Sequence, residues 1–303
     1  MKIPVLLTCH NRREKTTACL TSLLIALERY NGLSESPIAF EVYLTDDGCT
    51  DGTVKAIKEL FRDENKLHIV KGNGNLFWAG GMRLAWGEAL KRHNEWDYYL
   101  LINDDVEFLS NVFDELFKAQ SYSIEHFGKE GLVSGITCDK ENPNKMTYGG
   151  SVYTNRLLGI KRRIEPNGDF QICDLTNANI LLVPSKVVGE IGILDKRFKH
   201  VGDYDYTFQA HRKGWPLILT AHFCGKCEND HRDPATEKKK VLSMNLKQRI
   251  QYFNFPTRCI HDQVLGEWTK TPLRAPVVLI GRVTNMLFPR FYYWLDSLRS
   301  RYE

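Results

Sequence analysis

This chain of 303 residues lacks several features that define other classes of protein. No apolar run approaches the roughly 20 residues needed to span a bilayer. The apolar stretch at residues 3–7 is too short for the core of a secretory signal, so neither membrane spanning nor export is expected. The 8 cysteines are scattered along the chain, which is typical of reduced thiols in a cytoplasmic protein. Internal repeats and low-complexity segments are absent too.

An excess of positive charge is absent from most of the chain and is confined to its last part. The net charge is +4, yet residues 232–303 carry 13 Lys and Arg against 6 Asp and Glu, which leaves 28 against 31 in residues 1–231. This balance argues against a basic main domain that binds nucleic acid, so no nucleic-acid partner is expected. The basic end of the chain remains available to an anionic surface.

Short apolar runs and helical patterns alternate along the first half of the chain. Runs typical of strands occur at residues 4–9, 40–47, 66–72 and 97–105, with helical patterns at 14–30, 53–63 and 80–93. This alternation predicts an α/β fold, with a mostly parallel sheet flanked by helices on both faces. The composition shifts near Asp233, and helical patterns follow it. We therefore expect a sheet domain over residues 1–231 and a basic, aromatic helical extension over residues 232–303.

Three of the expected strands end in polar residues, and ligands of such sheets bind beyond the carboxyl ends of the strands. The run "YYLLI" leads directly into Asn103, Asp104 and Asp105. Carboxylates crowded at the end of a buried strand repel each other and are costly to desolvate. A divalent cation, Mg²⁺ or Mn²⁺, is the expected partner.

A second acidic strand end lies in "YLTDDGCTDGT", where Asp46 and Asp47 precede a glycine turn. One interpretation is a well-capped turn between strand and helix. The other is a carboxylate that accepts a hydrogen bond from a base, for which the imide N–H of uracil or thymine is the suitable donor.

In order and spacing, "LLTCHNR", "TDDGCTDGT", "INDDV" and "GDYDYTFQAHRKGW" resemble the motifs of family-2 glycosyltransferases of the GT-A fold. The resemblance covers residues 3–219. It implies donor-binding roles for residues at all three strand ends: Thr8, Asn11, Asp46, Asp47, Asn103 and Asp104. Of these, Asp47 is expected at the base, while Asp105 becomes the metal ligand. Asn103 stands where a strict "DxD" motif has its first aspartate, so the site carries one charge fewer.

The stretch "KGNGNLFWAGGMRLAW" is a glycine-rich loop that leads into a helix expected to start near Gly80. Such a loop suits phosphate or sugar hydroxyls, although its aromatic residues are equally suited to packing on the sheet. A similar run occurs in the rhamnosyltransferase-like branch of the resembled family, which favours a dTDP- or UDP-sugar. The donor-binding candidates here are Asn75, Trp78, Gly80 and Gly81.

The catalytic base implied by the resemblance is Asp203, although Gly202 replaces the glutamate that usually precedes it. One carboxylate that takes a proton from an acceptor hydroxyl, opposite a diphosphate stabilised by a cation, implies inversion at the anomeric carbon. Helix capping by an acidic first turn is the alternative interpretation. Asp205 is a secondary acidic candidate.

The segment "HFCGKCENDH" offers two further possibilities. The resemblance implies that a histidine beyond the base segment, His222 or His231, serves the metal or diphosphate. Alternatively, both histidines together with Cys224 and Cys227 form a compressed zinc set.

The aromatic and basic residues of the tail suit peripheral attachment to a membrane carrying a lipid-linked acceptor, but also helix packing or a homodimer. The sequence thus predicts a cytoplasmic, metal-dependent glycosyltransferase that acts on a surface glycan. Two alternatives are a non-catalytic sugar-nucleotide or glycan-binding module and a sugar nucleotidyltransferase. The latter is disfavoured because "TCHNRREK" has no glycine-rich loop after the first strand.

Overall fold

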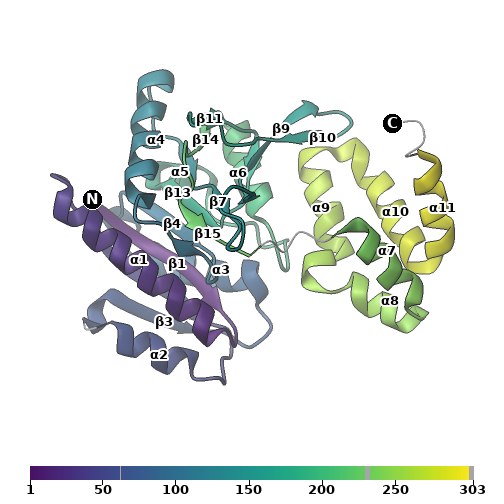
Figure 1. Cartoon of the computed structure of the whole chain (residues 1–303), viewed down its shortest axis with the longest axis horizontal. Helices are drawn as coiled ribbons and strands as arrows, with labels where there is room; N and C mark the ends of the chain where they lie inside the picture. Colours follow the sequence, from purple (N-terminus) through teal and green to yellow (C-terminus); the bar gives the residue numbers. More distant parts are fainter. Residues whose placement is uncertain (62, 229–232, 300–303) are drawn as a thin grey trace.

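A central eight-stranded sheet and a separate group of C-terminal helices make up the computed structural model of the chain (Figure 1). The structure describes residues 1–61, 63–228 and 233–299. The strand order is β11-β14-β6-β13-β4-β1-β2-β3. The strands of this sheet are β1 (Lys2–Cys9), β2 (Ala39–Asp46), β3 (Leu67–Lys71), β4 (Tyr98–Ile102), β6 (Leu132–Ser134), β11 (Gln171–Ile172), β13 (Ile180–Pro184) and β14 (Leu217–Leu219).

The sheet is mostly parallel, as the alternating pattern predicts. Strands β3, β2, β1 and β4 form one parallel block, and β14 is parallel to β6. Strand β13 lies antiparallel between β4 and β6, and β11 is antiparallel to β14. Two small sheets complete this part of the molecule: β9 (Gly150–Asn155), β10 (Ile160–Arg163) and β12 (Leu175–Thr176) in one, and β5 (Glu107–Phe108), β7 (Thr137–Cys138), β8 (Met146–Tyr148) and β15 (Gly225–Lys226) in the other.

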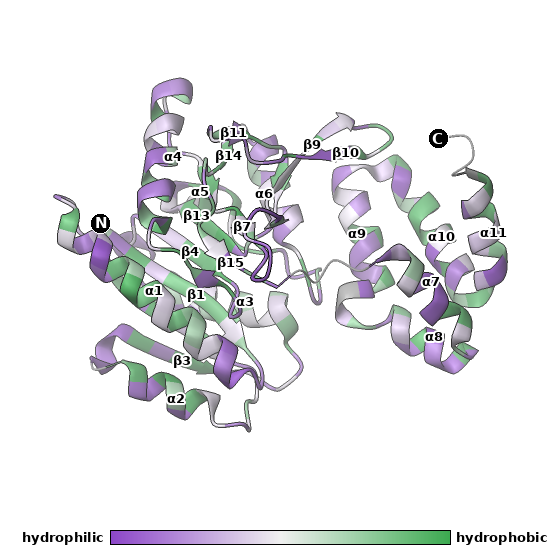
Figure 2. Ribbon diagram, viewed as in Figure 1, coloured by the Kyte–Doolittle hydropathy of each residue, from purple (hydrophilic) through white to green (hydrophobic). Residues whose placement is uncertain are grey.

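Helices cover both faces of the central sheet. One face packs on α1 (Arg13–Leu33), α2 (Thr53–Leu60) and α4 (Val112–Phe127), and the other on α3 (Phe77–Leu90), α5 (Ser185–Ile191) and α6 (Asp203–Arg212). Because both faces are covered, all five residues of β4 are buried. Figure 2 shows the resulting hydrophobic strands at the centre. Short 3-10 helices occur at η1 (Glu64–Lys66), η2 (His93–Glu95), η3 (Pro256–Arg258) and η4 (Pro272–Arg274).

Helix α3 lies unusually close to β1. A Cβ atom on Gly81 would stand 2.1 Å from Oγ1 of Thr8, so only glycine permits this approach. The helix begins at Phe77, three residues before the predicted start at Gly80, and Phe77 has a φ of 53°. The close contact brings the start of α3 to the carboxyl end of β1.

The C-terminal helices are α7 (Pro234–Ser243), α8 (Leu246–Phe253), α9 (Ile260–Lys270), α10 (Ala275–Leu287) and α11 (Pro289–Arg299). Helix α9 faces α6, and Thr269 Oγ1 donates a hydrogen bond to the Asp205 carboxylate. At a second contact, Arg274 Nη1 donates to the carbonyl of Gly159 at 2.8 Å. Within the described part of the chain, no helix has the length and apolar character required to cross a membrane.

Candidate active site

The strand ends that sequence reasoning singled out meet at one edge of the sheet. Thr8 pairs with Thr45 in the register of β1 and β2, and Leu6 pairs with Leu101 of β4. The residues that follow these three parallel strands therefore leave the sheet side by side, as expected for parallel strands.

Arg12 joins the two carboxylates that follow β4. Its Nη1 lies 2.8 Å from Asp104 Oδ1, and its Nη2 lies 2.6 Å from Asp105 Oδ2. Both aspartates are buried, at 5% and 7% exposure, whereas the arginine side chain is 37% exposed. The positive charge expected between these carboxylates is thus supplied in the structure by a guanidinium, whose planar donors suit such a pair.

Burial raises the pKa of the Asp104 carboxyl to about 6. The neighbouring charge of Asp105 adds to this rise, while Arg12 and a hydrogen bond from Thr16 Oγ1 oppose it. Because desolvation outweighs the favourable charge, the Asp104 carboxylate would gain from a stronger positive partner. Carboxylate oxygens are the hard ligands that Mg²⁺ and Mn²⁺ accept, so the residues fit the predicted cation.

Asn103 connects three segments at this edge. Its Oδ1 accepts the indole N–H of Trp78 at 2.8 Å, and its Nδ2 donates to Oδ1 of Asn179 at 3.0 Å. The neutral amide that replaces a first aspartate therefore uses both of its polar atoms within the protein. It orients Trp78 and links the end of β4 to the start of β13.

Asp47 supports the glycine-rich loop before α3. Its Oδ1 accepts the backbone N–H of Gly74 at 2.8 Å, and its Oδ2 accepts those of Leu76 and Phe77 at 2.8 and 3.2 Å. The side chain is only 3% exposed. Three of about four lone-pair positions of this carboxylate are thus occupied within the protein. The glycine-rich loop is therefore held in place by a carboxylate.

The remaining donor-site candidates differ in their contacts: some accept hydrogen bonds from the backbone, and others are packed or exposed. The Asn11 side chain accepts the Thr50 N–H at 2.7 Å, and its φ is 50°. The Asp46 carboxylate accepts the Cys49 N–H at 2.8 Å, which holds the turn after β2. Thr8 packs on α3, and Asn75 is exposed on the loop. Gly80 faces Leu76, so of the two helix glycines only Gly81 contacts β1.

Asp203 reaches the same edge from α6. It is the first residue of that helix, and its Oδ2 accepts the backbone N–H of Ala178 at 3.3 Å, one residue before the Asn179 that contacts Asn103. Burial raises the pKa of this carboxyl, with backbone donors opposing the rise. Asp205, two residues later, points away from this edge toward Thr269 of α9. The structure thus brings Asp203 to the strand ends, whereas Asp205 lies away from them.

The comparisons with known proteins agree with this geometry. The profile of glycosyl transferase family 2 matches residues 5–173, which is more than half of the chain. The chain belongs to glycosyl transferase family 2. No curated protein sequence matches it significantly.

Solved structures show the same GT-A fold at low sequence identity. A mannosyltransferase from Pyrobaculum calidifontis, PcManGT, in complex with GDP-Man and Mn²⁺, has a TM-score of 0.50 and 11% identity, and the match covers 99% of this chain and 79% of that one. TarS of S. aureus has a TM-score of 0.53 and 15% identity, with coverage of 96% and 88%. TarS in complex with UDP has the same score and identity, with coverage of 94% and 90%. The predicted family and fold class are therefore confirmed.

His222 and Cys224, two residues of the predicted metal site, have other neighbours in this family-2 glycosyltransferase. His222 is exposed and faces Glu115 of α4, with Nδ1 and Oε1 3.2 Å apart, and Cys224 is buried beside Thr220. In the described part of the chain, His222, Cys224 and Cys227 do not form a group of three metal-ligating side chains within 4.8 Å of one another. His231 lies outside the described residues. Cys227 does reach the strand ends, where its Sγ is 3.7 Å from Asp105 Oδ1.

Sequence reasoning missed Arg12 and the pair Asn177 and Asn179, in which the Asn177 side chain accepts the backbone N–H of Asn179 at 3.1 Å. The signal for Arg12 is its position directly after Asn11 at the end of the first strand, although a cation is not a metal ligand. The asparagines precede β13, whose antiparallel insertion beside β4 had no local signal.

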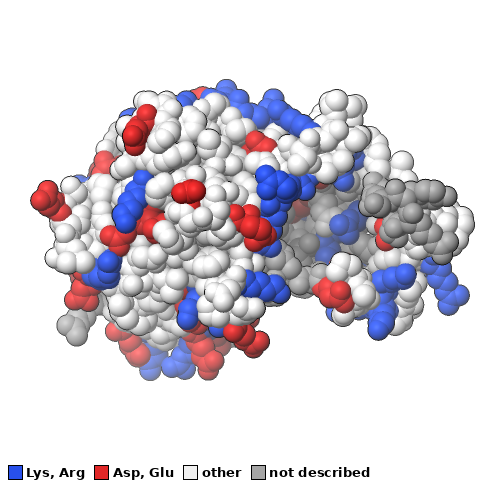
Figure 3. Space-filling view, turned by 45° about the horizontal axis from the view of Figure 1, so that its top comes forward, with Lys and Arg blue, Asp and Glu red and all other residues white. Residues whose placement is uncertain are grey.

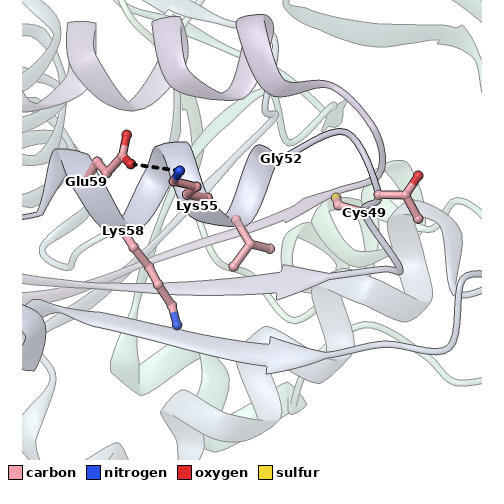
Figure 4. Close-up of a pocket in the computed structure, with 7 residues that line it drawn as sticks. Cys49, Gly52, Lys55, Lys58 and Glu59 are labelled. Carbon is pink, nitrogen blue, oxygen red and sulfur yellow. Dashed lines mark ion pairs between the residues drawn. The ribbon is translucent and has the colours of Figure 1, made fainter.

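Two other features lie away from the strand ends. In the described ranges, the one group of three metal-ligating residue types within 4.8 Å is His200, Cys259 and Asp262, where α9 meets the loop before α6. A pocket of about 600 Å³ lies on α2, where Lys55 and Glu59 pair at 4.0 Å (Figure 4). Its lining includes none of the carboxylates described above, so we assign it no role in the chemistry.

Proposed function

We propose that this chain is an inverting, hexosyltransferase-type enzyme that moves a sugar from a nucleoside diphosphate to a hydroxyl of a surface polysaccharide or lipid-linked glycan. The observation that carries the proposal is the connected edge of the sheet, where buried Asp104 and Asp105, the loop held by Asp47, and Asp203 meet around Asn103. Residues 1–231 form the catalytic domain in this proposal, and residues 232–303 form the helical extension.

Asp104 and Asp105 would hold the divalent cation, Mg²⁺ or Mn²⁺. When bound, the cation supplies positive charge that stabilises the leaving diphosphate. PcManGT, whose structure contains Mn²⁺ and GDP-Man, supports this assignment by analogy. The planar guanidinium donors of Arg12 suit phosphate oxygens as well as carboxylates. The indole of Trp78, held by Asn103, offers a flat surface beside the diphosphate.

Asp203 is the proposed general base. Its carboxylate takes the proton of the acceptor hydroxyl, and that oxygen forms a bond to the anomeric carbon as the bond to the diphosphate breaks on the opposite face. The configuration at this carbon therefore inverts. Because burial raises the pKa of Asp203, the carboxylate is a stronger base than an exposed aspartate.

The role of Asp203 is tested with Asp203→Asn. This variant is expected to lose about 10²–10⁴-fold in kcat while its nucleotide affinity is unchanged, because the amide cannot accept the proton. NMR of the product reads the anomeric configuration directly, and retention of the donor's configuration would contradict the mechanism.

The donor class is tested by calorimetric titration of UDP, dTDP, GDP and ADP, each with and without Mn²⁺. We expect a pyrimidine diphosphate, dTDP or UDP, to bind most tightly, in a metal-dependent manner that Asp105→Ala abolishes. The solved neighbours, one with GDP-Man and one with UDP, make GDP a necessary comparison. Absence of nucleotide binding under all conditions would refute the donor site and favour a glycan-binding module.

The acceptor side of the proposal includes peripheral contact with the cytoplasmic face of an anionic membrane. Large apolar side chains are exposed on η4, α10, α11 and the residue that joins α10 to α11: Leu273, Val277, Ile280, Phe288, Phe291 and Trp294. Figure 2 shows hydrophobic stretches on α10 and a mixture of hydrophobic and hydrophilic residues on α11, and Figure 3 shows Lys and Arg side chains on the surface of the same part of the molecule. Apolar residues beside basic ones match an anionic lipid surface better than a neutral partner.

Sedimentation with vesicles tests this contact. We expect binding to vesicles with 30% phosphatidylglycerol, weaker binding to pure phosphatidylcholine, and loss of binding in the double variant Val277→Asp, Ile280→Asp. Failure to bind the anionic vesicles would refute membrane contact. Light scattering on the same samples would then show whether the apolar face makes a homodimer instead.

A further inference from the structure

The loop that precedes the proposed base is held by a carboxylate from the C-terminal extension. Asp262 of α9 accepts the backbone N–H of Lys199 on Oδ1 at 3.1 Å, and those of His200 and Val201 on Oδ2 at 2.8 and 3.4 Å. Only 2% of Asp262 is exposed. Three successive N–H groups that converge on one buried carboxylate fix the course of the loop.

These three N–H groups occupy three of about four lone-pair positions of Asp262, and a ring nitrogen of His261 lies at the fourth. His261 Nδ1 lies 2.8 Å from Oδ1, and His200 Nδ1 lies 3.2 Å from Oδ2. The Cys259 thiol lies within 4.8 Å of the same group, which resembles a set of metal ligands. Because the Asp262 oxygens already accept backbone donors, the arrangement is better suited to supporting the loop than to binding an ion.

The supported loop joins two parts of the candidate active site. The carbonyl of His200 accepts the N–H of Ala79 in the first turn of α3 at 3.0 Å, and the ring of His200 lies 4.9 Å from that of Phe77. In the other direction, Val201 is followed by Gly202 and then by Asp203 at the start of α6. The position of this loop therefore affects both the glycine-rich loop and the base.

A second contact secures α6 from the same helix. Thr269 of α9 donates to the Asp205 carboxylate. Burial lowers the pKa of Lys270, the next residue, and the charges of Asp205 and Asp203 oppose this fall. Helix α9 thus holds the chain on both sides of Asp203.

We propose that Asp262 is a positioning residue for Asp203, so that the C-terminal extension completes the catalytic unit rather than only attaching it to an acceptor surface. This inference rests on the proposed function of Asp203. The hydrogen bonds of Asp262 are independent of that proposed function. Loss of the Asp262 carboxylate is expected to release the loop at residues 199–201 and to displace Asp203 from its acceptor.

The test combines hydrogen exchange with kinetics in the full-length protein. In the wild type, we expect the amides of residues 199–201 to be protected. In Asp262→Asn, the side-chain NH₂ group cannot accept hydrogen bonds from these N–H groups. Hydrogen exchange of the 199–201 amides is therefore expected to rise about 10–100-fold, the scale expected when hydrogen bonds to a charged group are lost. We expect kcat to fall about 100-fold, the scale of a 1 Å misplacement, with nucleotide-diphosphate affinity unchanged within about twofold.

Two further variants separate positioning from general loss of structure. Asp262→Glu keeps the carboxylate and is expected to restore part of both protection and kcat. Asp296→Asn removes a carboxylate from exposed α11 and is expected to behave as the wild type.

The outcomes distinguish this inference from the proposed function. Free exchange of the 199–201 amides in the wild type would overturn the inference even if Asp262→Asn failed to fold. Equal losses of kcat and nucleotide affinity would also overturn it, as would a metal ion that copurifies with the wild type and not with Asp262→Asn. Protected amides in a protein with no transfer activity would instead refute the proposed function and leave the support by Asp262 intact.

Discussion

Replacing Arg12 by methionine removes the guanidinium between Asp104 and Asp105 while retaining a long side chain. Breaking a buried ion pair costs about 3–5 kcal/mol. Water reaches the 37% of the Arg12 side chain that is exposed, so we expect a smaller loss, about 2 kcal/mol, in metal-free protein. This corresponds to a decrease in Tm of roughly 4–6 °C in calorimetry with a chelator present.

The same variant is expected to bind Mn²⁺ more tightly. In the wild type, a cation competes with the guanidinium for the Asp104 and Asp105 oxygens, and this competition disappears in Arg12→Met. A gain of about 2 kcal/mol corresponds to about 30-fold in Kd, which calorimetric titration of Mn²⁺ measures.

The neighbouring residue provides the matched control. Arg13 is exposed and has no ion pair with either aspartate, so Arg13→Met is expected to leave both Tm and Mn²⁺ affinity unchanged. If Arg12→Met were as stable as the wild type in chelator and bound Mn²⁺ with the same affinity, the reasoning that Arg12 occupies the cation's place would be refuted.

Two further predictions concern packing and pH. Gly81→Ala is expected to cost about 1–3 kcal/mol or more in urea unfolding, because its Cβ would collide with Thr8, whereas Gly87→Ala in the same helix, with no atom within 4 Å of its Cβ, is expected to gain about 0.5–1 kcal/mol. Equal effects of the two substitutions would contradict the close packing of α3 on β1. The raised pKa of Asp104 means that the folded state binds the proton of this carboxyl more tightly than the unfolded state does. The protonated side chain therefore stabilises the fold below about pH 4, and this stabilisation is lost as the pH rises through about 6. The loss is about 3 kcal/mol. Urea unfolding at pH 4 and 7 should show this decline in metal-free wild type but not in Asp104→Asn, and an identical decline in both would exclude Asp104 as its source.

Much of the fold was predictable because its signals are local. Alternating apolar runs and helical periods identified β1, β2, β3, β4 and the helices between them. Strands that end in polar residues and lie parallel must deliver those residues to one edge, which is why Asp47, Asp104 and Asp105 were found by position alone. The antiparallel insertion of β13 was not predictable, since strand pairing between distant segments leaves no local pattern.

The sequence by itself determined the α/β class, the family motifs and the carboxylates at the strand ends, since adjacent residues and short periods encode all three. Only the tertiary structure decided which partners these carboxylates meet. It directed Asp47 to the glycine-rich loop, paired Arg12 with two aspartates more than 90 residues away, and turned Asp205 away from Asp203. It also carried Asp262 to the loop at residues 199–201. Such contacts depend on how helices pack on the sheet, and packing is a property of the whole chain rather than of any short segment of it.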